Sequence, residues 1–416
     1  MRRPLAARAI AALVAGTCLF AVAAQAADDA AKDAIRSVAD AYDATGRRLV
    51  GELAKSADAN ANILLSPYSV GSAMAMALSG ARGATEQDMA AALKLTMPGA
   101  EMREANAALI AALNNLGTAG GKAAPINLNV ANAIFVAGKD SLVSRDYVTL
   151  VHDKFSAELF AGVDVGAING WVKTKTEGKI DKLLDEVSPN AAAVLLNAVY
   201  FKAPWATPFN KEQTADAPFN LAADRQINVP TMRHTGSYAA LAGDGFNAIR
   251  LPYANNALGM IVVVPNEIDG LAKVSEKLDA ESVSKLVSGL SGNPGRQIAL
   301  SLPRFKATYE ADLIPAFKQI GMKLPFDALK ADFGGIVGQP NAEGVLSIGQ
   351  IKHKAVVEVA EEGTEAAAAT GVEILARSAR VQRPDEFVVD RPFLFFIADN
   401  TTGAILFEGR IVDPSR

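Results

Sequence analysis

The chain has 416 residues, of which 50% are hydrophobic, with 41 basic and 45 acidic residues and a formal net charge of −4. This length is enough to bury a large core without disulfides, and the acidic balance argues against nucleic acid or an anionic membrane surface as a partner. No Pro-, Ser- or Gly-rich linker divides the chain, which predicts one large domain.

Residues 1–26 have the features of a signal peptide. Arg2, Arg3 and Arg8 give a positive start, an apolar run follows to residue 23, and Ala24-Gln25-Ala26 fits a small-residue cleavage site. The apolar run is too short for a comfortable membrane anchor. We therefore expect removal of the signal near Ala26, a single domain over residues 27–416, and a secreted or periplasmic product with no membrane contact.

Residue types that support catalysis or metal binding are sparse. Cys18 is the only cysteine and would leave with the signal, as would three arginines, so 41 basic residues become 38 against 45 acidic and the net charge becomes −7. The three histidines, His152, His234 and His353, lie far apart and outside HExxH spacing. No GxSxG or GxxxxGK[ST] motif is present. We expect no metal, no cofactor and no enzyme activity, although a triad of scattered Ser, His and Asp remains open.

The predicted elements mix helices and strands. Residues 28–55 predict an amphipathic helix, residues 67–80 a buried helix of small apolar residues, Thr85 to Asp88 a capped helix start, and residues 168–184 a surface helix. Segment 101–116 contains only Arg103 as a basic residue, so no polyanion site is evident. Because strands and helices do not alternate as βαβ units, the fold class is α+β. The predicted strands are 126–136, 194–201, 248–251, 259–264, 298–302, 356–360, 393–398 and 405–411.

The segment from Glu361 to Arg383 carries a period-2 pattern. One face is uncharged (Thr364, Ala366, Ala368, Thr370, Val372, Ile374), and the other carries the charges (Glu365, Ala367, Ala369, Gly371, Glu373). This alternation is typical of a strand with one buried face. The alternative is an alanine-rich surface helix, since Ala and Glu are strong helix formers.

Several motifs, in order, resemble the serpin family over essentially the whole mature chain. The segment Glu361-Glu362-Gly363-Thr364-Glu365-Ala366-Ala367-Ala368-Ala369-Thr370 resembles the hinge of inhibitory serpins at every position. Further resemblance lies in residues 62–69 (NILLSPYS), 196–205 (LNAVYFKAPW), 302–305 (LPRF), 351–356 (IKHKAV), 391–396 (RPFLFF) and 406–412 (LFEGRIV).

This resemblance implies a serpin fold, with a large mixed β-sheet, two smaller sheets, surrounding helices and an exposed reactive-centre loop at about 361–383. It implies a suicide substrate that traps the acyl-enzyme by inserting its cleaved loop into the large sheet. The bait residue of inhibitory serpins lies fourteen positions after the hinge glycine, which gives the bond Arg377–Ser378. A trypsin-like protease would accept this arginine. Arg380–Val381 and Leu375–Ala376 are alternative bonds, and Arg377 alternatively only solubilises the loop.

Two further sets of residues match positions that serpins use where the large sheet opens. Ser66, Ser69, Asn197 and His353 match the polar cluster beneath the centre of the large sheet, with ordinary core polar residues as the alternative. Arg304 and Trp205 match contacts where the loop joins the sheet, and Glu361 is expected to pair with Arg304.

Other functions remain open from the sequence. These are a non-inhibitory serpin acting as a binding or chaperone module, an inhibitor of cysteine proteases, and a hydrolase. We expect a monomer, with loop–sheet polymers as a possible side state.

Overall fold

The computed structural model describes most of the chain. Its described residues are 6–58, 60–117, 126–136, 143–162, 165–186, 193–254, 256–339, 342–364 and 383–416, with the backbone alone for residues 6–24 and 27. Part of the predicted hinge, Glu365 to Thr370, and the predicted bonds at Leu375, Arg377 and Arg380 lie outside the described residues.

A six-stranded mixed sheet runs through the described part of the chain. Its strand order is β10-β11-β12-β4-β2-β3, and β11 also pairs with β4. The β11–β4 and β2–β3 pairs are parallel, and the other pairs are antiparallel. The strands are β2 (Asn127–Val136), β3 (Glu158–Ala161), β4 (Ala193–Pro204), β10 (Phe305–Asp312), β11 (Ile348–Ala360) and β12 (Gly363–Thr364).

The remaining described strands form a second hydrogen-bonded system. Its order is β1-β15-β14-β8-β7-β6-β9-β13, with β5 paired to β6. The long strand β6 joins two parts, because its first half pairs with β5 and β9 and its second half with β7. The two expected smaller sheets are therefore continuous through β6. The strands are β1 (Ile63–Leu65), β5 (Ala215–Ala222), β6 (Arg225–Gly243), β7 (Phe246–Pro252), β8 (Leu258–Pro265), β9 (Arg296–Pro303), β13 (Asp385–Val388), β14 (Phe393–Asp399) and β15 (Ile405–Ile411).

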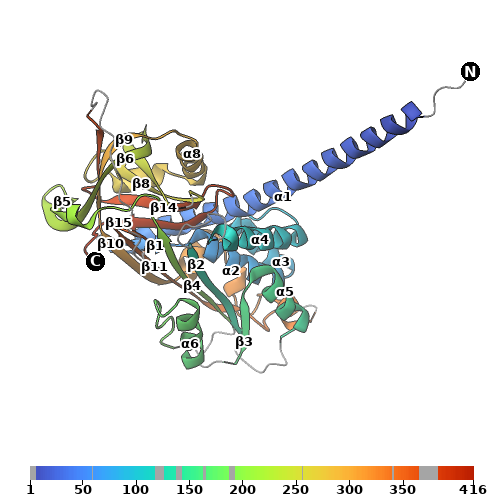
Figure 1. Cartoon of the computed structure of the whole chain (residues 1–416). Coiled ribbons are helices and arrows are strands. Elements are labelled where there is room, and N and C mark those ends of the chain that lie inside the picture. The colour runs from blue at the N-terminus through green and yellow to red at the C-terminus, as the bar shows by residue number, and fades with distance from the viewer. Residues whose placement is uncertain are drawn as a thin grey trace, which may run out of the picture.

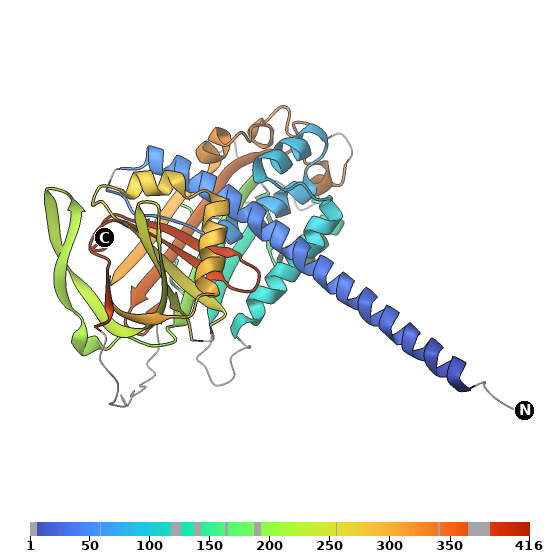
Figure 2. The ribbon, with the colours of Figure 1, turned by 90° about the horizontal axis from the view of Figure 1, so that it is seen from above.

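Helices surround these sheets (Figure 1). Figure 2 shows α1 crossing the molecule and then projecting beyond it toward the N-terminus. The described helices are α1 (Ala6–Ser56), α2 (Pro67–Gly80), α3 (Gly83–Leu93), α4 (Gly99–Asn114), α5 (Arg145–Phe155), α6 (Val165–Lys175), α7 (Leu271–Lys277), α8 (Ala280–Ser291), α9 (Ile314–Gln319) and α10 (Gly334–Val337).

Helix α2 is central because its sequence permits close packing on every side. Ser66 caps its start by accepting the N–H of Ser69 at 3.2 Å, and Pro67 occupies the first turn, where no N–H is needed. Every residue of α2 is buried. A Cβ on Gly71 would lie 2.3 Å from the ring of Tyr42 in α1, so only glycine allows this approach of the two helices.

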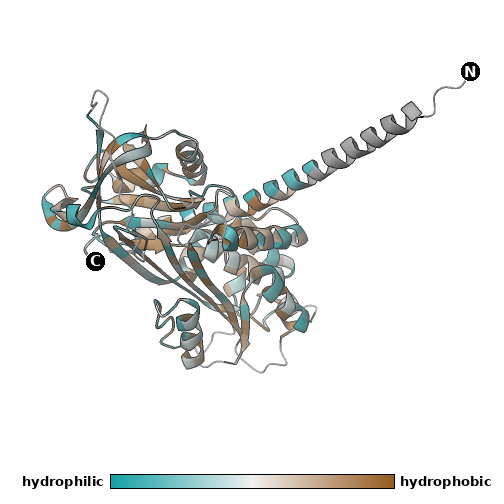
Figure 3. Ribbon diagram, in the orientation of Figure 1, coloured by the Kyte–Doolittle hydropathy of each residue, from teal (hydrophilic) through white to brown (hydrophobic). Residues whose placement is uncertain are grey.

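In the part of the chain that the structure describes, three apolar clusters hold the layers together. The largest cluster packs the helices α1, α2, α3, α4 and α5 against the inner faces of both sheet systems. A second cluster lies beneath α7 and α8. A third packs α6 on the outer face of β2 and β4, through Ile168 and Val172. Figure 3 shows hydrophobic residues along the central strands and hydrophilic residues on the outer helices and turns.

The structure corrects some expected elements. The N-terminal helix starts at Ala6, not near residue 28, because the alanine-rich segment before it continues the helix without a break. The expected cap at Thr85 is wrong: α3 begins at Gly83, and the buried Thr85 hydroxyl accepts the N–H of Asp332 at 2.9 Å. The surface helix α6 ends at Lys175. Among the described residues, no helix has the length and apolar character needed to cross a membrane.

Candidate functional site

The short strand β12 starts to separate two strands of the six-stranded sheet. After β11, the chain turns at Glu361 and Glu362 and comes back as Gly363 and Thr364. Thr364 pairs with Val359 of β11 on one side and with Ala203 of β4 on the other. Below this point β11 and β4 pair directly, from Ile348 and Ala193 up to Val356 and Tyr200. The first two residues of the segment thus lie as an antiparallel strand between two parallel ones.

The turn into β12 requires a glycine. Gly363 has φ of 152°, and a Cβ at this position would lie 2.2 Å from the carbonyl oxygen of Ala203. Thr364 follows with its side chain fully buried, and its Oγ1 lies 2.7 Å from the Tyr253 hydroxyl. The face predicted to be buried from the alternation is therefore the buried face at the first position where the structure describes it.

Polar and aromatic side chains from several segments surround this turn and fix its position. The turn itself is formed by Glu361, Glu362, Gly363 and Thr364, and the surrounding side chains are those of Trp205, Tyr253, Thr214 and Arg304. The Glu361 side chain is 5% exposed and lies 3.7 Å from the half-exposed Arg304 guanidinium. Its Oε1 also accepts from the Thr214 hydroxyl at 2.8 Å. The expected Arg304–Glu361 ion pair is present, and the neutral Thr214 hydroxyl gives the Glu361 carboxylate a second partner.

Trp205 holds the backbone of the turn. Its indole N–H donates to the carbonyl of Ala360 at 2.9 Å, its backbone N–H donates to the carbonyl of Glu362 at 3.0 Å, and its ring stacks on Tyr253 with centroids 4.6 Å apart. On the solvent side of the turn, Lys211 Nζ lies 2.5 Å from Glu362 Oε1. Sequence reasoning missed Tyr253, Thr214 and Lys211, because they come from separate strands and turns and share no spacing with the hinge.

The polar cluster beneath the sheet is assembled from four segments of the chain. Ser66 and Ser69 start α2, Asn197 lies in the middle of β4, and His353 lies opposite Asn197 in β11. His353 Nδ1 hydrogen-bonds to Asn197 Oδ1, and Asn197 Nδ2 donates to Ser69 Oγ and to Asn132 Oδ1, the latter at 2.6 Å. The structure thus brings the four predicted residues together and adds Asn132 of β2, which the sequence did not single out.

The electrostatics of His353 differ from those of an exposed histidine. Burial lowers the pKa of His353 to about 3, and the Leu64 backbone carbonyl offsets this only in part. The imidazole is therefore neutral at physiological pH and links β11 to β4 through a neutral hydrogen bond. This bond joins the two strands that β12 begins to separate.

This depressed pKa predicts a pH dependence of stability. As pH falls from about 6.5 toward 3, unfolded His353 binds a proton that the folded state does not, so stability falls by up to about 1.4 kcal/mol per pH unit. Urea unfolding of the parent and of His353→Gln at pH 7 and pH 5 tests this. We expect the parent to lose about 2 kcal/mol more than the variant; equal losses would contradict it.

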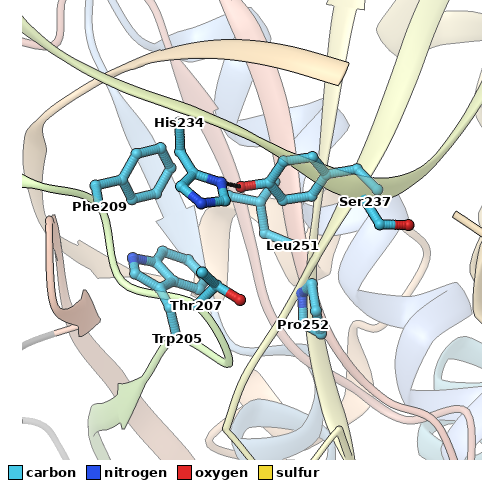
Figure 4. A pocket seen from close by; sticks show the side chains of 8 residues that line it. Trp205, Thr207, Phe209, His234, Ser237, Leu251 and Pro252 are labelled. Atoms are coloured by element: carbon cyan, nitrogen blue, oxygen red, sulfur yellow. Dashed lines mark hydrogen bonds between the residues drawn. The ribbon is translucent and has the colours of Figure 1, made fainter. Parts of the chain in front are cut away.

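A small pocket of about 40 Å³ lies behind Trp205, between β6, β7 and the segment after β4. Figure 4 shows His234 beside the ring of Phe209. The His234 ring also packs edge-on against the ring of Tyr238, and its Nδ1 lies 2.7 Å from the Tyr238 hydroxyl. The Ser237 hydroxyl points away from His234 (Figure 4). The pocket has room for about one water molecule.

The chain matches known proteins over most of its length. A model of the family described as serpin (serine protease inhibitor) matches residues 40–414. The leukocyte elastase inhibitor of Bos taurus is 35% identical, over 85% of this chain and 93% of that protein. An uncharacterized serpin-like protein of Thermococcus kodakarensis is 33% identical, over 85% of this chain and 81% of that protein.

Solved structures match the fold at similar coverage. Serpin48 of the insect Tenebrio molitor, described as a highly specific serpin, is 27% identical with a TM-score of 0.78, over 91% of this chain and 98% of that one. The thermophilic serpin tengpin in its native state is 27% identical with a TM-score of 0.79, over 90% of this chain and 94% of that one.

Proposed function

The chain belongs to the serpin family, and we propose that it inhibits trypsin-like serine proteases by inserting its cleaved loop between β11 and β4. The observation that carries this proposal is β12. Gly363 and Thr364 already pair with both strands, and Thr364 already faces the core. A cleaved loop would only have to continue a strand that has begun.

The register of β12 supports a full insertion of the right length. Continued residue by residue, it would bring Ile374 opposite Ala193, the first residue of β4, and Leu375 opposite Ile348, the first residue of β11. The inserted strand would therefore end where both of its neighbours end. In this register a bond at Arg377 would lie just past the end of the inserted strand, which favours Arg377–Ser378 over Arg380–Val381 as the bait.

The same register fits the inward residues to the core. Ala366, Ala368, Val372 and Ile374 would share the face of Thr364. In the register of β12 they would lie opposite Val357, Ala355, Ile351 and Gly349 of β11; the first three of these partners belong to the main core. Small and β-branched side chains can be buried against these core residues, whereas a charged side chain would lose its hydration there without gaining a partner.

Thr370 would meet the polar cluster. In this register it would lie between His353 and Asn197, so insertion would break their hydrogen bond. The Thr370 hydroxyl can both donate and accept, and it would replace the lost partner for each. The cluster would thus be satisfied before and after the strands part, which supports its assignment as a sheet-opening group.

The proposed chemistry needs no catalytic residue from this chain. The serine oxygen of the protease attacks the Arg377 carbonyl carbon, the bond to the Ser378 nitrogen breaks, and the amine leaves with a proton. The acyl ester then links the protease to the new end of the loop. Insertion of Thr364 to Leu375 carries this end roughly 40 Å along the sheet, and distortion of the protease stalls hydrolysis of the ester.

Insertion is favourable on simple grounds. Each new backbone hydrogen bond contributes about 0.5–1.5 kcal/mol net, so a dozen contribute on the order of 10 kcal/mol. This is comparable to the stability of a whole domain. The same steps would also trap a cysteine protease as a thioester. The absence of bulky or charged residues on the inward hinge face disfavours a non-inhibitory binding or chaperone role.

Equimolar incubation with trypsin, followed by denaturing electrophoresis, tests this proposal. We expect a band at the summed mass of trypsin and the larger fragment of the chain, together with loss of trypsin activity. Cleavage of the chain with undiminished trypsin activity would contradict inhibition and favour the non-inhibitory alternative.

We also propose that the protein is exported and loses residues 1–26, on the basis of the charged start, apolar run and small-residue site of that segment. An N-terminal sequence beginning at Ala27 on protein recovered outside the cytoplasm is the expected result.

A further inference from the structure

A pocket among the helices α2, α3, α4 and α5 takes no part in the proposed loop insertion. These helices pack on one another beside the sheets (Figure 1). The pocket has a volume of about 340 Å³, which lies within the range of small-molecule sites. Its apolar lining comes from all four helices and from the segment that joins α3 to α4: Leu78, Ala90, Leu95, Met97, Met102 and Leu150.

The floor of this pocket belongs to the main core. Leu78, Leu95 and Met102 are at most 7% exposed. Met97 and Leu150 are partly buried and pack against the same core. Among the described residues that line the pocket there is no aromatic ring, and methionine side chains adapt to the shape of the group that they contact. Such a floor suits a flexible aliphatic chain better than a flat ring.

One guanidinium at the pocket has no partner within the described part of the chain. Arg103, near the start of α4, lines the pocket, is partly buried, and forms no hydrogen bond or ion pair with the described residues. A Cβ at Gly99 would lie 3.3 Å from Arg103 Nη1, so the arginine side chain folds back along the first turn of α4. Its positive charge is therefore held beside the apolar floor.

Arg82 adds a second positive charge, in a fixed position. Its Nη1 donates to the carbonyls of Ser79 and Ala81 at 3.2 and 2.7 Å, and its guanidinium lies against Gly335, where a Cβ would come within 2.4 Å of Nη2. Among the described residues that line the pocket, Glu86 is the one carboxylate, and no ion pair joins it to either arginine. Two arginines and one glutamate give the lining a formal charge of +1.

We propose that this pocket binds a fatty acid, with its aliphatic chain on the Leu and Met floor and its carboxylate on the Arg103 guanidinium. A guanidinium can donate two parallel N–H bonds to one carboxylate, and Arg103 has no partner among the described residues to give up. An uncharged ligand would leave this guanidinium unused. A polyanion would meet only two positive groups, with Glu86 beside them, so a single anionic head fits the lining best.

Calorimetric titration of the purified protein with decanoate tests this proposal. We expect one decanoate to bind per chain. Octanoate should bind on the order of tenfold more weakly, because each buried methylene group changes the affinity about fourfold. Decanol has the same chain without the charge, and it should also bind on the order of tenfold more weakly than decanoate. Decanol affinity equal to that of decanoate, or several decanoate molecules bound per chain, would overturn the inference.

Two variants locate the site. Arg103→Gln removes the charge, and Ala90→Leu places a larger apolar side chain in the pocket; each should weaken decanoate binding on the order of tenfold or more. Arg225→Gln is the matched control, because Arg225 is exposed at the start of β6 and does not line the pocket. Without decanoate, Arg103→Gln should melt at the parental temperature. Equal decanoate affinity of the parent and all three variants would overturn the inference.

A second measurement does not depend on the variants. Decanoate that carries a diazirine at the end of its chain is cross-linked to the protein by light, and the labelled peptides are identified by mass spectrometry. We expect the label in the peptides that contain Met97 or Leu150, at the floor of the pocket, and we expect excess decanoate to remove it. Label confined to other segments would overturn the inference.

Discussion

Arg377→Ala is expected to abolish inhibition of trypsin-like proteases while leaving the fold intact. An arginine that enters the protease pocket pairs with a buried acidic group, and loss of one partner of such a pair costs about 2–5 kcal/mol, or roughly 30-fold to several thousandfold in affinity. The rate of trypsin inactivation by parent and variant measures this effect. Because the bait residue has to be accessible to enter the protease pocket, the substitution is expected to leave the thermal stability of the uncleaved protein unchanged.

Arg380→Ala is the matched control, since it removes the same charge three residues further along. It should inhibit at nearly the parental rate, and mass spectrometry of the released C-terminal peptide should show a start at Ser378. A peptide that starts at Val381, with inhibition surviving Arg377→Ala, would move the bait to Arg380 and would contradict the strand length inferred from β11 and β4.

Thr364→Arg is expected to convert the inhibitor into a substrate. Thr364 is fully buried and hydrogen-bonds to Tyr253, so an arginine would have to bury an unpaired charge or leave the sheet. Burial of an unpaired charge costs several kcal/mol, which would slow insertion on the order of a hundredfold or more. Hydrolysis of the acyl ester would then win, and trypsin would cut the variant at Arg377 and remain active.

Glu365→Arg tests the register one position along. The register of β12 would place residue 365 on the opposite face, opposite Glu358, whose side chain is 41% exposed. An arginine there can reach solvent or pair with Glu358, and inhibition should persist. Because a slip of one residue exchanges the two faces of a strand, a more damaging Glu365→Arg would show that the strand assignment of this loop is wrong.

The sequence predicted the parts of the site that carry a local pattern. The alternation from Thr364 onward predicted which face of the hinge is buried, and the structure bears this out at Thr364 itself. The buried helix at residues 67–80 followed from small apolar residues after a Ser-Pro start, and α2 has these bounds. The strands at β4, β8, β14 and β15 followed from apolar runs bounded by turn residues.

Contacts between distant segments could not be predicted in the same way. Asn132 belongs to the polar cluster only because β2 pairs with β4 in a register that brings it opposite Asn197. Tyr253 forms an isolated β-bridge with Trp205, and its hydroxyl hydrogen-bonds to Thr364. The long strand β6 was missed because polar residues and Gly236 interrupt its apolar pattern, and its pairing on both sides stabilises it instead. The serpin resemblance supplied the polar cluster, which no spacing in the sequence indicates.

Thermal unfolding of intact and loop-cleaved protein tests loop insertion most directly. If the cut loop inserts between β11 and β4, a dozen new hydrogen bonds and the burial of Ala366 to Ile374 should raise the melting temperature on the order of 10 °C or more. If the cut loop stays outside the sheet, the two proteins will melt at the same temperature, and this result would contradict the account.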